Sequence, residues 1–152
     1  MNKIDLNSIL DDRIMGVNLS ANTKEEAIRH LAKLLLNQGY ISDINSFERD
    51  IYYRESLGKT GIGNAIAIPH GQSESVIKNG IAIGAFENEI PWESLDGKPV
   101  RIVCLFSVKA GDGGENEHLR MLAALAGRLG NDEVVEMLCN ARTVEEIKEA
   151  FS

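Results

Sequence analysis

The chain has 152 residues, 43% of them hydrophobic, which fits one folded domain over residues 1–152 and excludes a disordered segment. Its formal net charge of -7 argues against a general nucleic-acid-binding protein, which would carry a basic surface. Because no apolar run approaches the roughly 18 residues of a membrane helix and the first residues lack the apolar segment of a signal peptide, we expect a cytoplasmic protein with no direct membrane insertion.

The first third of the chain predicts one strand and one helix. The apolar residues at 14–19 form a strand candidate. Thr23 and Glu26 have the spacing of a capping box, which predicts that a helix begins after Thr23. The residues expected on its buried face recur at helical spacing and are Ala27, Ile28, Leu31, Leu34 and Leu35. Gly39 is the predicted stop of this helix.

A second helix is predicted over residues 45–57. Phe47, Ile51 and Leu57 are expected to face inward, because they recur at the period of a helix. Gly58 is expected to end it, since glycine interrupts helices readily.

Three strand candidates follow, at 65–68, 81–86 and 100–108. Each is rich in Ile, Val, Ala or Phe, residues that favour strands or a buried position. The last candidate is almost continuously apolar, as expected of a strand that is buried on both faces. The Gly-Lys-Pro sequence at 97–99 supplies a turn before it.

The last third predicts three helices. A flexible glycine-rich loop at 111–114 precedes a helix over 116–129, and a shorter helix covers 132–139. Thr143 and Glu146 form a second capping box, which predicts a terminal helix after Thr143. The buried residues expected in the first and last of these helices are Leu119, Leu122, Ala126, Leu129, Ile147 and Phe151.

Helices thus bracket a run of apolar strands. We therefore expect a single-domain α/β sandwich, in which a mixed, mainly parallel sheet of about five strands carries helices on both faces. Cys104 lies in an apolar run and Cys139 lies near a helix end, and both are expected to be buried, reduced thiols.

The segment from Thr60 to Gly71, TGIGNAIAIPHG, is the strongest functional motif. A glycine-bearing loop leads into a short apolar strand that we expect to end at Pro69, His70 and Gly71. Pro69 restricts the backbone before the histidine, and Gly71 leaves room for another molecule to approach. An imidazole held at such a strand end can act as a nucleophile or a proton carrier, although a plain hydrogen-bonding role fits equally well.

Two further histidines and one arginine are candidates for the same site. His30 lies beside core positions of the first helix, so a structural or surface role is expected for it. His118 falls in the first turn of its predicted helix, where free amides attract anions, but an exposed polar residue also fits there. Arg54 falls near the end of a helix, where the dipole favours a cation without any further role.

The sequence lacks the common motifs for cofactors and metals. Gly61 and Gly63 are not followed by the Lys-Ser or Lys-Thr of a Walker loop, and their spacing does not match the dinucleotide pattern. No pair of Cys or His residues has the spacing of metal ligands, and no Gly-x-Ser-x-Gly occurs. We therefore expect no cofactor and no metal.

The order of the motif residues resembles a known family. Glu55, six residues, Ile62-Gly63, two residues and then Ile66-Ala67-Ile68-Pro69-His70-Gly71 resemble the phosphohistidine signature of the type 2 (fructose/mannitol) enzyme IIA domains. These domains belong to the bacterial phosphoenolpyruvate-dependent sugar phosphotransferase system, and the resemblance extends from about Ile14 to Phe151. Arg54 and His118 fall where the resemblance places the active-site arginine and a second histidine, and residues 92–100 are similar to the segment before the central strand.

The resemblance implies a phosphotransferase component with a mixed five-stranded sheet. His70 would accept a phosphoryl group on Nε2 from phospho-HPr and pass it to a cysteine of a IIB domain. Arg54, His118 and the backbone amides of residues 60–64 would then bind the phosphate oxygens. Contact with the membrane would be indirect, through IIB and IIC, and no nucleic acid is involved. Some relatives carry an acidic residue where this chain has Asn64, so this loop is expected to tune His70 differently.

Two alternatives to a sugar phosphocarrier remain open from the sequence. A nitrogen-related regulatory IIA protein would use the phosphorylation state of the same histidine to gate protein contacts, although residues 95–100 favour the sugar branch and a fructose-like sugar. A structural domain with incidental histidines would be unaffected in phosphorylation by the loss of Arg54 or His118.

Overall fold

The computed structural model describes residues 6–111 and 113–152, so the predicted loop at 111–114 lies partly outside the described residues. The strands are β1 (Met15–Leu19), β2 (Gly61–Gly63), β3 (Ile66–Ala67), β4 (His70–Ser73), β5 (Gly80–Ile90) and β6 (Val100–Lys109). The helices are α1 (Leu6–Ile9), the 3-10 helix η1 (Asp12–Ile14), α2 (Lys24–Asn37), α3 (Ile44–Leu57), α4 (Gly114–Leu129), α5 (Asp132–Asn140) and α6 (Val144–Ala150).

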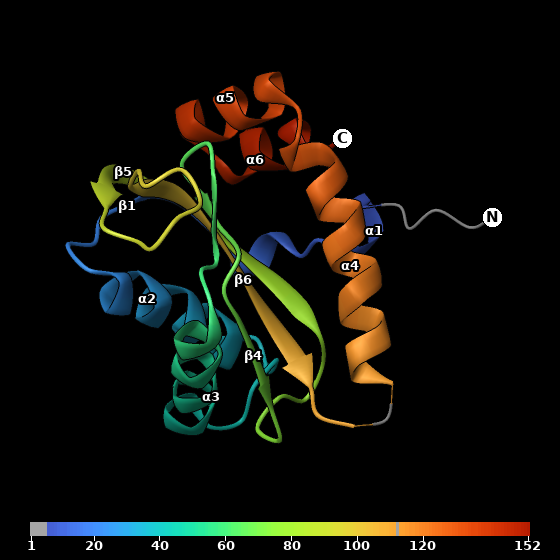
Figure 1. Ribbon diagram of the computed structural model, residues 1–152. Coiled ribbons are helices and arrows are strands. Elements are labelled where there is room, and N and C mark those ends of the chain that lie inside the picture. Colours follow the sequence, from blue (N-terminus) through green and yellow to red (C-terminus); the bar gives the residue numbers. More distant parts are fainter. Residues whose placement is uncertain (1–5, 112) are drawn as a thin grey trace.

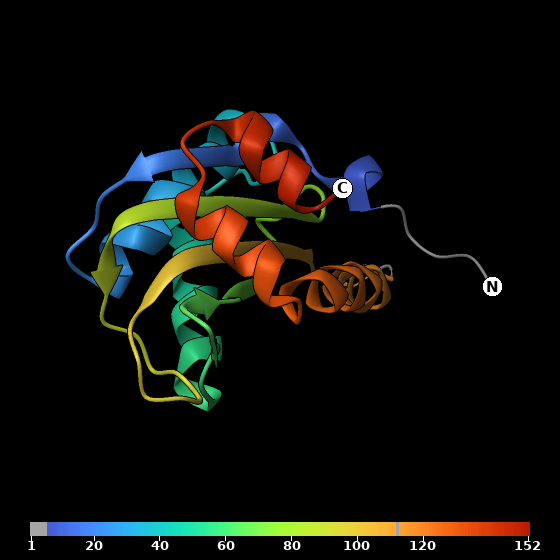
Figure 2. The same ribbon diagram turned by 90° about the horizontal axis from the view of Figure 1, so that it is seen from above.

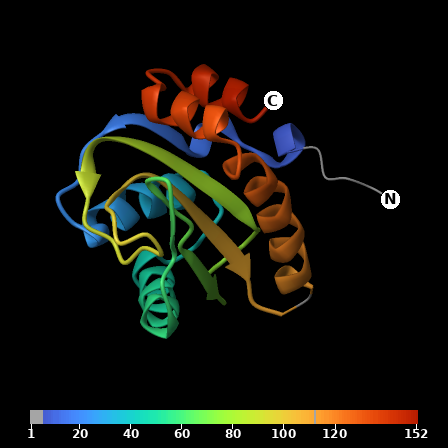
Figure 3. The ribbon, with the colours of Figure 1, turned by 45° about the horizontal axis from the view of Figure 1, so that its top comes forward.

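The strands form one mixed sheet with the order β1–β5–β6–β3–β2, and β4 also pairs with β6 (Figure 1). Strand β6 is parallel to β3 and β4 and antiparallel to β5, whereas β1 is parallel to β5. Helices α2 and α3 lie on one side of this sheet, and α4, α5 and α6 lie on the other (Figure 3). The predicted α/β sandwich with a mainly parallel sheet is therefore confirmed.

Helices α2 and α6 begin at the predicted capping boxes, and α2 ends beside the predicted glycine. Thr23 accepts a hydrogen bond from the Glu26 amide at 3.1 Å, and Thr143 repeats this contact with Glu146. The returning carboxylate of Glu26 binds the amide of Asn22, one residue earlier than in the standard capping box. Gly39 adopts a φ of 76°, the left-handed conformation in which glycine commonly terminates a helix.

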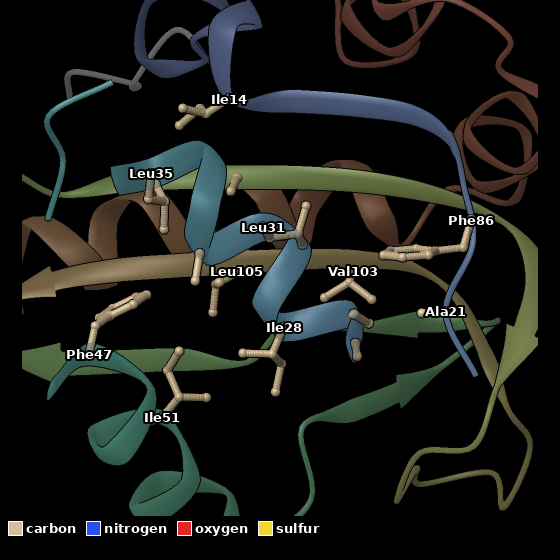
Figure 4. Close-up of a cluster of buried hydrophobic side chains, with 14 of the residues drawn as sticks. Ile14, Ala21, Ile28, Leu31, Leu35, Phe47, Ile51, Phe86, Val103 and Leu105 are labelled. Carbon is tan, nitrogen blue, oxygen red and sulfur yellow. The ribbon is translucent and has the colours of Figure 1, made fainter. Parts of the chain in front are cut away.

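Strand β6 separates two layers of the hydrophobic core, because alternate residues of a strand point to opposite faces. Val103 and Leu105 belong to the core layer on the side of α2 and α3, together with Leu31, Phe47 and Ile51 (Figure 4). The alternate β6 residues face α4–α6 and are Ile102, Cys104, Phe106 and Val108. This confirms the prediction that the strand is buried on both faces.

Three residues expected in the core are exposed, namely Leu57, Leu119 and Ala126. Leu57 is 64% exposed, because it is the last residue of α3 and extends beyond the sheet. Helix α4 buries Met121, Leu125 and Leu129, whereas Leu119 is 54% exposed. The apolar spacing of this leucine-rich helix fits two neighbouring faces, and packing against the sheet selects between them. The predicted core positions Leu122 and Ala126 lie beside that face and are half-buried and exposed.

The two cysteines differ in their burial. Cys104 is fully buried in β6, and burial raises the pKa of its thiol to about 12. Cys139 lies in α5 and is only half-buried, so the prediction of a buried thiol is not met there. Both cysteines are free thiols.

Candidate functional site

The motif histidine lies where the chain is broken between two short strands. The predicted strand at 65–68 is only β3, Ile66–Ala67, and a new strand, β4, begins at His70. Both run along the same edge of β6, with Pro69 in the interruption because proline cannot donate a ladder hydrogen bond. The expectation that the strand ends at the histidine is therefore wrong: His70 is the first residue of a strand.

The register of β4 sets the direction of the His70 side chain. His70 is the partner of Phe106 on β6, and Phe106 faces the α4 side of the sheet. Neighbouring residues on parallel strands share a face, so the imidazole also points towards α4. Gly71 points to the opposite face, where an added Cβ would lie 2.8 Å from atoms of Phe47 and Ile51. The glycine thus lets α3 pack closely behind the histidine.

A small pocket opens at this imidazole. Its volume is about 100 Å³, and its lining residues are Arg54, Lys59, Thr60, Ile68, His70, His118 and Leu122. Helix α3 supplies Arg54 at its last turn, the loop into β2 supplies Lys59 and Thr60, and α4 supplies His118. Figure 2 shows α4 (orange) nearly end-on beside the sheet, and His118 of this helix lines the pocket. The pocket therefore collects side chains from three separate parts of the chain.

His118 is the closest aromatic neighbour of His70. Their ring centroids are 5.0 Å apart, and the His118 ring also contacts Phe106 edge-on at 5.0 Å. His118 is only 7% exposed, so the alternative of an exposed polar residue is wrong. The placement in the first turn is wrong as well, because α4 begins at Gly114 rather than at 116. The buried Nδ1 of His118 has no hydrogen-bond partner among the described residues.

Two cations border the histidine pair. Arg54 donates a hydrogen bond of 3.4 Å from Nη1 to the carbonyl of Gly58, as a basic residue near a helix C-terminus commonly does. The guanidinium also lines the pocket, so both predicted features of Arg54 are present. Lys59 also lines the pocket, and the sequence analysis did not predict it. The available signal was its position directly before the motif that contains His70.

Burial keeps both imidazoles neutral near pH 7. Burial, followed by the electrostatic effects of His118 and Arg54, lowers the pKa of His70 to about 4, against a smaller opposing effect of the Ile68 backbone. Burial also lowers the pKa of His118, and the carboxylate of Glu115 opposes this shift. A neutral imidazole has a free lone pair on one nitrogen, which a nucleophile requires.

The backbone of residues 60–64 offers fewer free donors than expected. The amide of Gly61 donates to the carbonyl of Glu93 at 3.1 Å, and that of Asn64 donates to Asp96 at 3.3 Å. These amides are used within the fold, because both donate to groups of the segment 93–96. The charged groups that remain for an anion are therefore the side chains of Arg54 and Lys59.

The arrangement fits group transfer to an imidazole. A neutral imidazole, two cations and a second histidine line a pocket of a size suited to a small anionic group. His30 lies apart from this cluster and binds the carbonyl of Ser20 at 3.1 Å, in agreement with its expected structural role.

No group of three His, Cys, Asp or Glu residues suited to a metal occurs in the parts of the chain that the structure describes. Within those same parts, no helix has the length and apolarity needed to cross a membrane.

Comparison with known proteins gives relatives with the same domain. The chain is 33% identical over 142 residues to the PTS system fructose-specific EIIABC component of Bacillus subtilis, covering 93% of this chain and 22% of that protein. It spans about a fifth of each of the first two relatives, both of them EIIABC components. The mannitol-specific phosphotransferase enzyme IIA component of Halalkalibacterium halodurans is 33% identical over 143 residues, with 92% of both chains covered.

Solved structures give the same result. The nitrogen regulatory protein IIA-Ntr from Neisseria meningitidis superposes with a TM-score of 0.85 at 25% identity, covering 97% of this chain and 99% of that one. IIA mannitol from Escherichia coli superposes with a TM-score of 0.79 at 27% identity, covering 94% and 99%. A family model described as "Phosphoenolpyruvate-dependent sugar phosphotransferase system, EIIA 2" matches residues 8–152. With the signature around His70, the fold and these relatives in agreement, the chain belongs to the EIIA type 2 family of the sugar phosphotransferase system.

Proposed function

We propose that the protein is a cytoplasmic phosphohistidine carrier of the sugar phosphotransferase system. His70 takes a phosphoryl group from phospho-HPr and passes it to a cysteine of a IIB domain, in the uptake of a fructose-like sugar. The observation that carries this proposal is the pocket at His70, which places Arg54, Lys59 and His118 around one neutral imidazole. Any association with the membrane then occurs through IIB and IIC.

Each transfer exchanges one bond to phosphorus for another. The lone pair of His70 Nε2 forms a P–N bond, while the P–N bond of the donor histidine breaks and returns its electron pair to the donor ring. In the second step a thiolate sulfur of IIB attacks phosphorus, and the electron pair of the breaking P–N bond returns to His70. Such transfers depend mainly on alignment and on stabilisation of the oxygens, since little further covalent chemistry is required.

The residues around His70 have separate tasks in this scheme. Arg54 can donate a planar pair of hydrogen bonds to two phosphoryl oxygens. Lys59 adds a mobile positive charge at the exposed rim. His118 presents a ring nitrogen at close range, and the negative phosphoryl group favours its protonated, hydrogen-bond-donating form. No cofactor or metal takes part in the proposed transfer.

Labelling with radioactive phosphoenolpyruvate, enzyme I and HPr tests this proposal. The wild-type protein should become labelled, and His70→Ala should not, because the nucleophile is missing. Arg54→Ala should slow labelling by about 100-fold, the size of effect seen when a positioned donor to a developing charge is removed. His30→Ala, a histidine outside the pocket, serves as the control and should label like the wild type. Full labelling of His70→Ala would refute the assignment.

A nitrogen-related regulatory protein is the second candidate function. The superposition with IIA-Ntr from Neisseria meningitidis supports it, whereas the relatives at 33% identity are named for fructose and mannitol. The phosphorylated protein should transfer its label to a fructose-type IIB domain if it serves sugar uptake. Failure to label any of a panel of sugar-specific IIB domains would favour the regulatory function instead.

A further inference from the structure

Glu55 has a buried carboxylate directly behind the pocket, although it does not line the pocket. Its side chain is 6% exposed, and Oε1 forms an ion pair with Lys24 Nζ and accepts a hydrogen bond of 2.9 Å from the Thr60 hydroxyl. The other oxygen, Oε2, is buried without a partner among the described residues. A buried carboxylate in such a state costs stability, and a buried ion pair is weak support for a purely stabilising role.

Thr60 receives contacts through both its side chain and its backbone. The hydroxyl donates to Glu55 and accepts from the indole Nε1 of Trp92 at 3.0 Å, so its orientation is determined from both sides. The Thr60 carbonyl accepts a hydrogen bond of 2.9 Å from the amide of Ile68. Thr60 is 3% exposed, and water therefore does not replace these contacts. The result is a fixed connection from the end of α3 to the residue that precedes Pro69.

Ile68 continues this connection to the imidazole. Ile68 and His70 line the same pocket, and the Ile68 backbone raises the pKa of the ring, as a carbonyl that accepts a hydrogen bond from the imidazole does. Because the Ile68 amide already donates to Thr60, its carbonyl is the group that accepts from the ring. A neutral imidazole that donates from one nitrogen has its lone pair on the other nitrogen. The Ile68 carbonyl thus selects one tautomer of His70, as the partners of other functional histidines do.

We propose that Glu55 and Thr60 are positioning residues that hold the Ile68 carbonyl against the His70 ring and thereby keep the attacking nitrogen unprotonated. This inference rests on the proposed role of His70 as the phosphoryl acceptor. It assigns the buried carboxylate a task in the transfer reaction that does not require contact with the phosphoryl group. It also connects Trp92, 22 residues after His70 in the sequence, to the reacting atom through the Thr60 hydroxyl.

The tautomer of His70 gives a direct test in the unphosphorylated protein. Two-bond proton–nitrogen correlation spectra of the histidine rings should show one neutral tautomer of His70 in the wild type. Thr60→Val, which keeps the shape but loses the hydroxyl, should show a mixture of the two tautomers. Thr60→Ser should restore the single form. Glu55→Gln keeps the volume and an acceptor but loses the charge, so it should give a smaller second population than Thr60→Val.

The rate of phosphoryl acceptance from phospho-HPr supplies the second readout. Thr60→Val should lower the maximal rate by about 10- to 100-fold, the usual loss when the partner of a functional histidine is removed, with little change in KM. Glu93→Gln is the matched control, because Glu93 also binds Lys24 but its side chain is 66% exposed and is not among the contacts of Thr60. It should retain the wild-type tautomer and rate.

The outcomes separate the two proposals. A single wild-type tautomer of His70 in folded Thr60→Val or Glu55→Gln protein would overturn the positioning role. If Thr60→Val does not fold, Glu55→Gln and Thr60→Ser carry the same comparison. If the variants change the tautomer of His70 but phospho-HPr does not label the wild-type protein, the positioning role is supported and the phosphocarrier function is refuted.

Discussion

The two walls of the His70 pocket are stabilised in different ways. The wall at the end of α3 is held by polar contacts, in which Glu55 and Thr60 receive partners from Lys24 and Trp92. The wall formed by α4 is held by packing, and His118 meets Phe106 edge-on while its buried Nδ1 has no partner. The first wall holds the segment before His70 through hydrogen bonds, and the second brings the His118 ring to the pocket. The proposed phosphocarrier binds and releases an anion, and these two properties suit that task.

Loss of the Phe106 ring should disrupt the packing of the α4 wall and cause the largest loss of stability. Phe106→Ala removes a buried aromatic ring, 1% exposed, and should lower the free energy of unfolding by about 3–5 kcal/mol. It should also change the ring signals of His118, because their contact is lost. Denaturant unfolding and histidine ring spectra measure the two effects.

A second phenylalanine provides the control for this experiment. Phe86 is 2% exposed, faces the α2 side of the sheet and contacts His30 rather than His118. Phe86→Ala should therefore cost similar stability and leave the His118 ring signals unchanged. If the His118 signals were the same in Phe106→Ala as in the wild type, the packed wall would not depend on Phe106.

A side chain at Gly71 should disturb the wall on the α3 side of the pocket. A Cβ there would lie 2.8 Å from Phe47 and Ile51, so Gly71→Ala should lower the free energy of unfolding by about 1–3 kcal/mol through overpacking. Since Gly71 follows His70 directly, the rate of phosphoryl acceptance should fall as well. Thermal or denaturant unfolding measures the first effect, and labelling from phospho-HPr measures the second.

Gly127 is the matched control for Gly71. It lies inside α4 with no atom within 4 Å of an added Cβ, so Gly127→Ala should raise the free energy of unfolding by about 0.5–1 kcal/mol. A loss of stability at Gly127, or none at Gly71, would contradict the packing described for these positions.

Lowering the pH should have the smallest of the expected effects on the free energy of unfolding. The pKa of His70 is lowered to about 4 and that of His118 is also lowered, so between pH 6.5 and 4 the folded state binds fewer protons than the unfolded state. Stability should thus be fully present above the ordinary histidine pKa and fall as the pH drops through this window. Each histidine contributes a slope of at most about 1.4 kcal/mol per pH unit, and solvent screening of the partly exposed His70 reduces its share.

Denaturant unfolding at a series of pH values measures this slope. The double substitution of His70 and His118 by Gln should flatten it between pH 6.5 and 4, because neither position then titrates. An unchanged slope in the double variant would show that other groups cause the acid sensitivity and that the histidine pair contributes none of it.

The sequence alone determined the longer helices and strands and their order, but not the short elements α1, η1, β2 and β4. Local signals were sufficient there: Thr23 and Thr143 start helices, Gly39 ends one, and β6 is apolar on both faces because a central strand is covered twice. The motif at His70 also identified the family, since the order of its residues is local in the chain.

Only the tertiary structure determined how the pocket is built. Helix α4 begins two residues earlier than predicted, and packing on the sheet selects the face that buries His118 and exposes Leu119. The partners of Glu55 and Thr60 come from Lys24 and Trp92, about 30 residues away in each direction. Hydrogen bonds and ring contacts of this kind depend on how separate elements pack, and no local pattern of residue types encodes that packing.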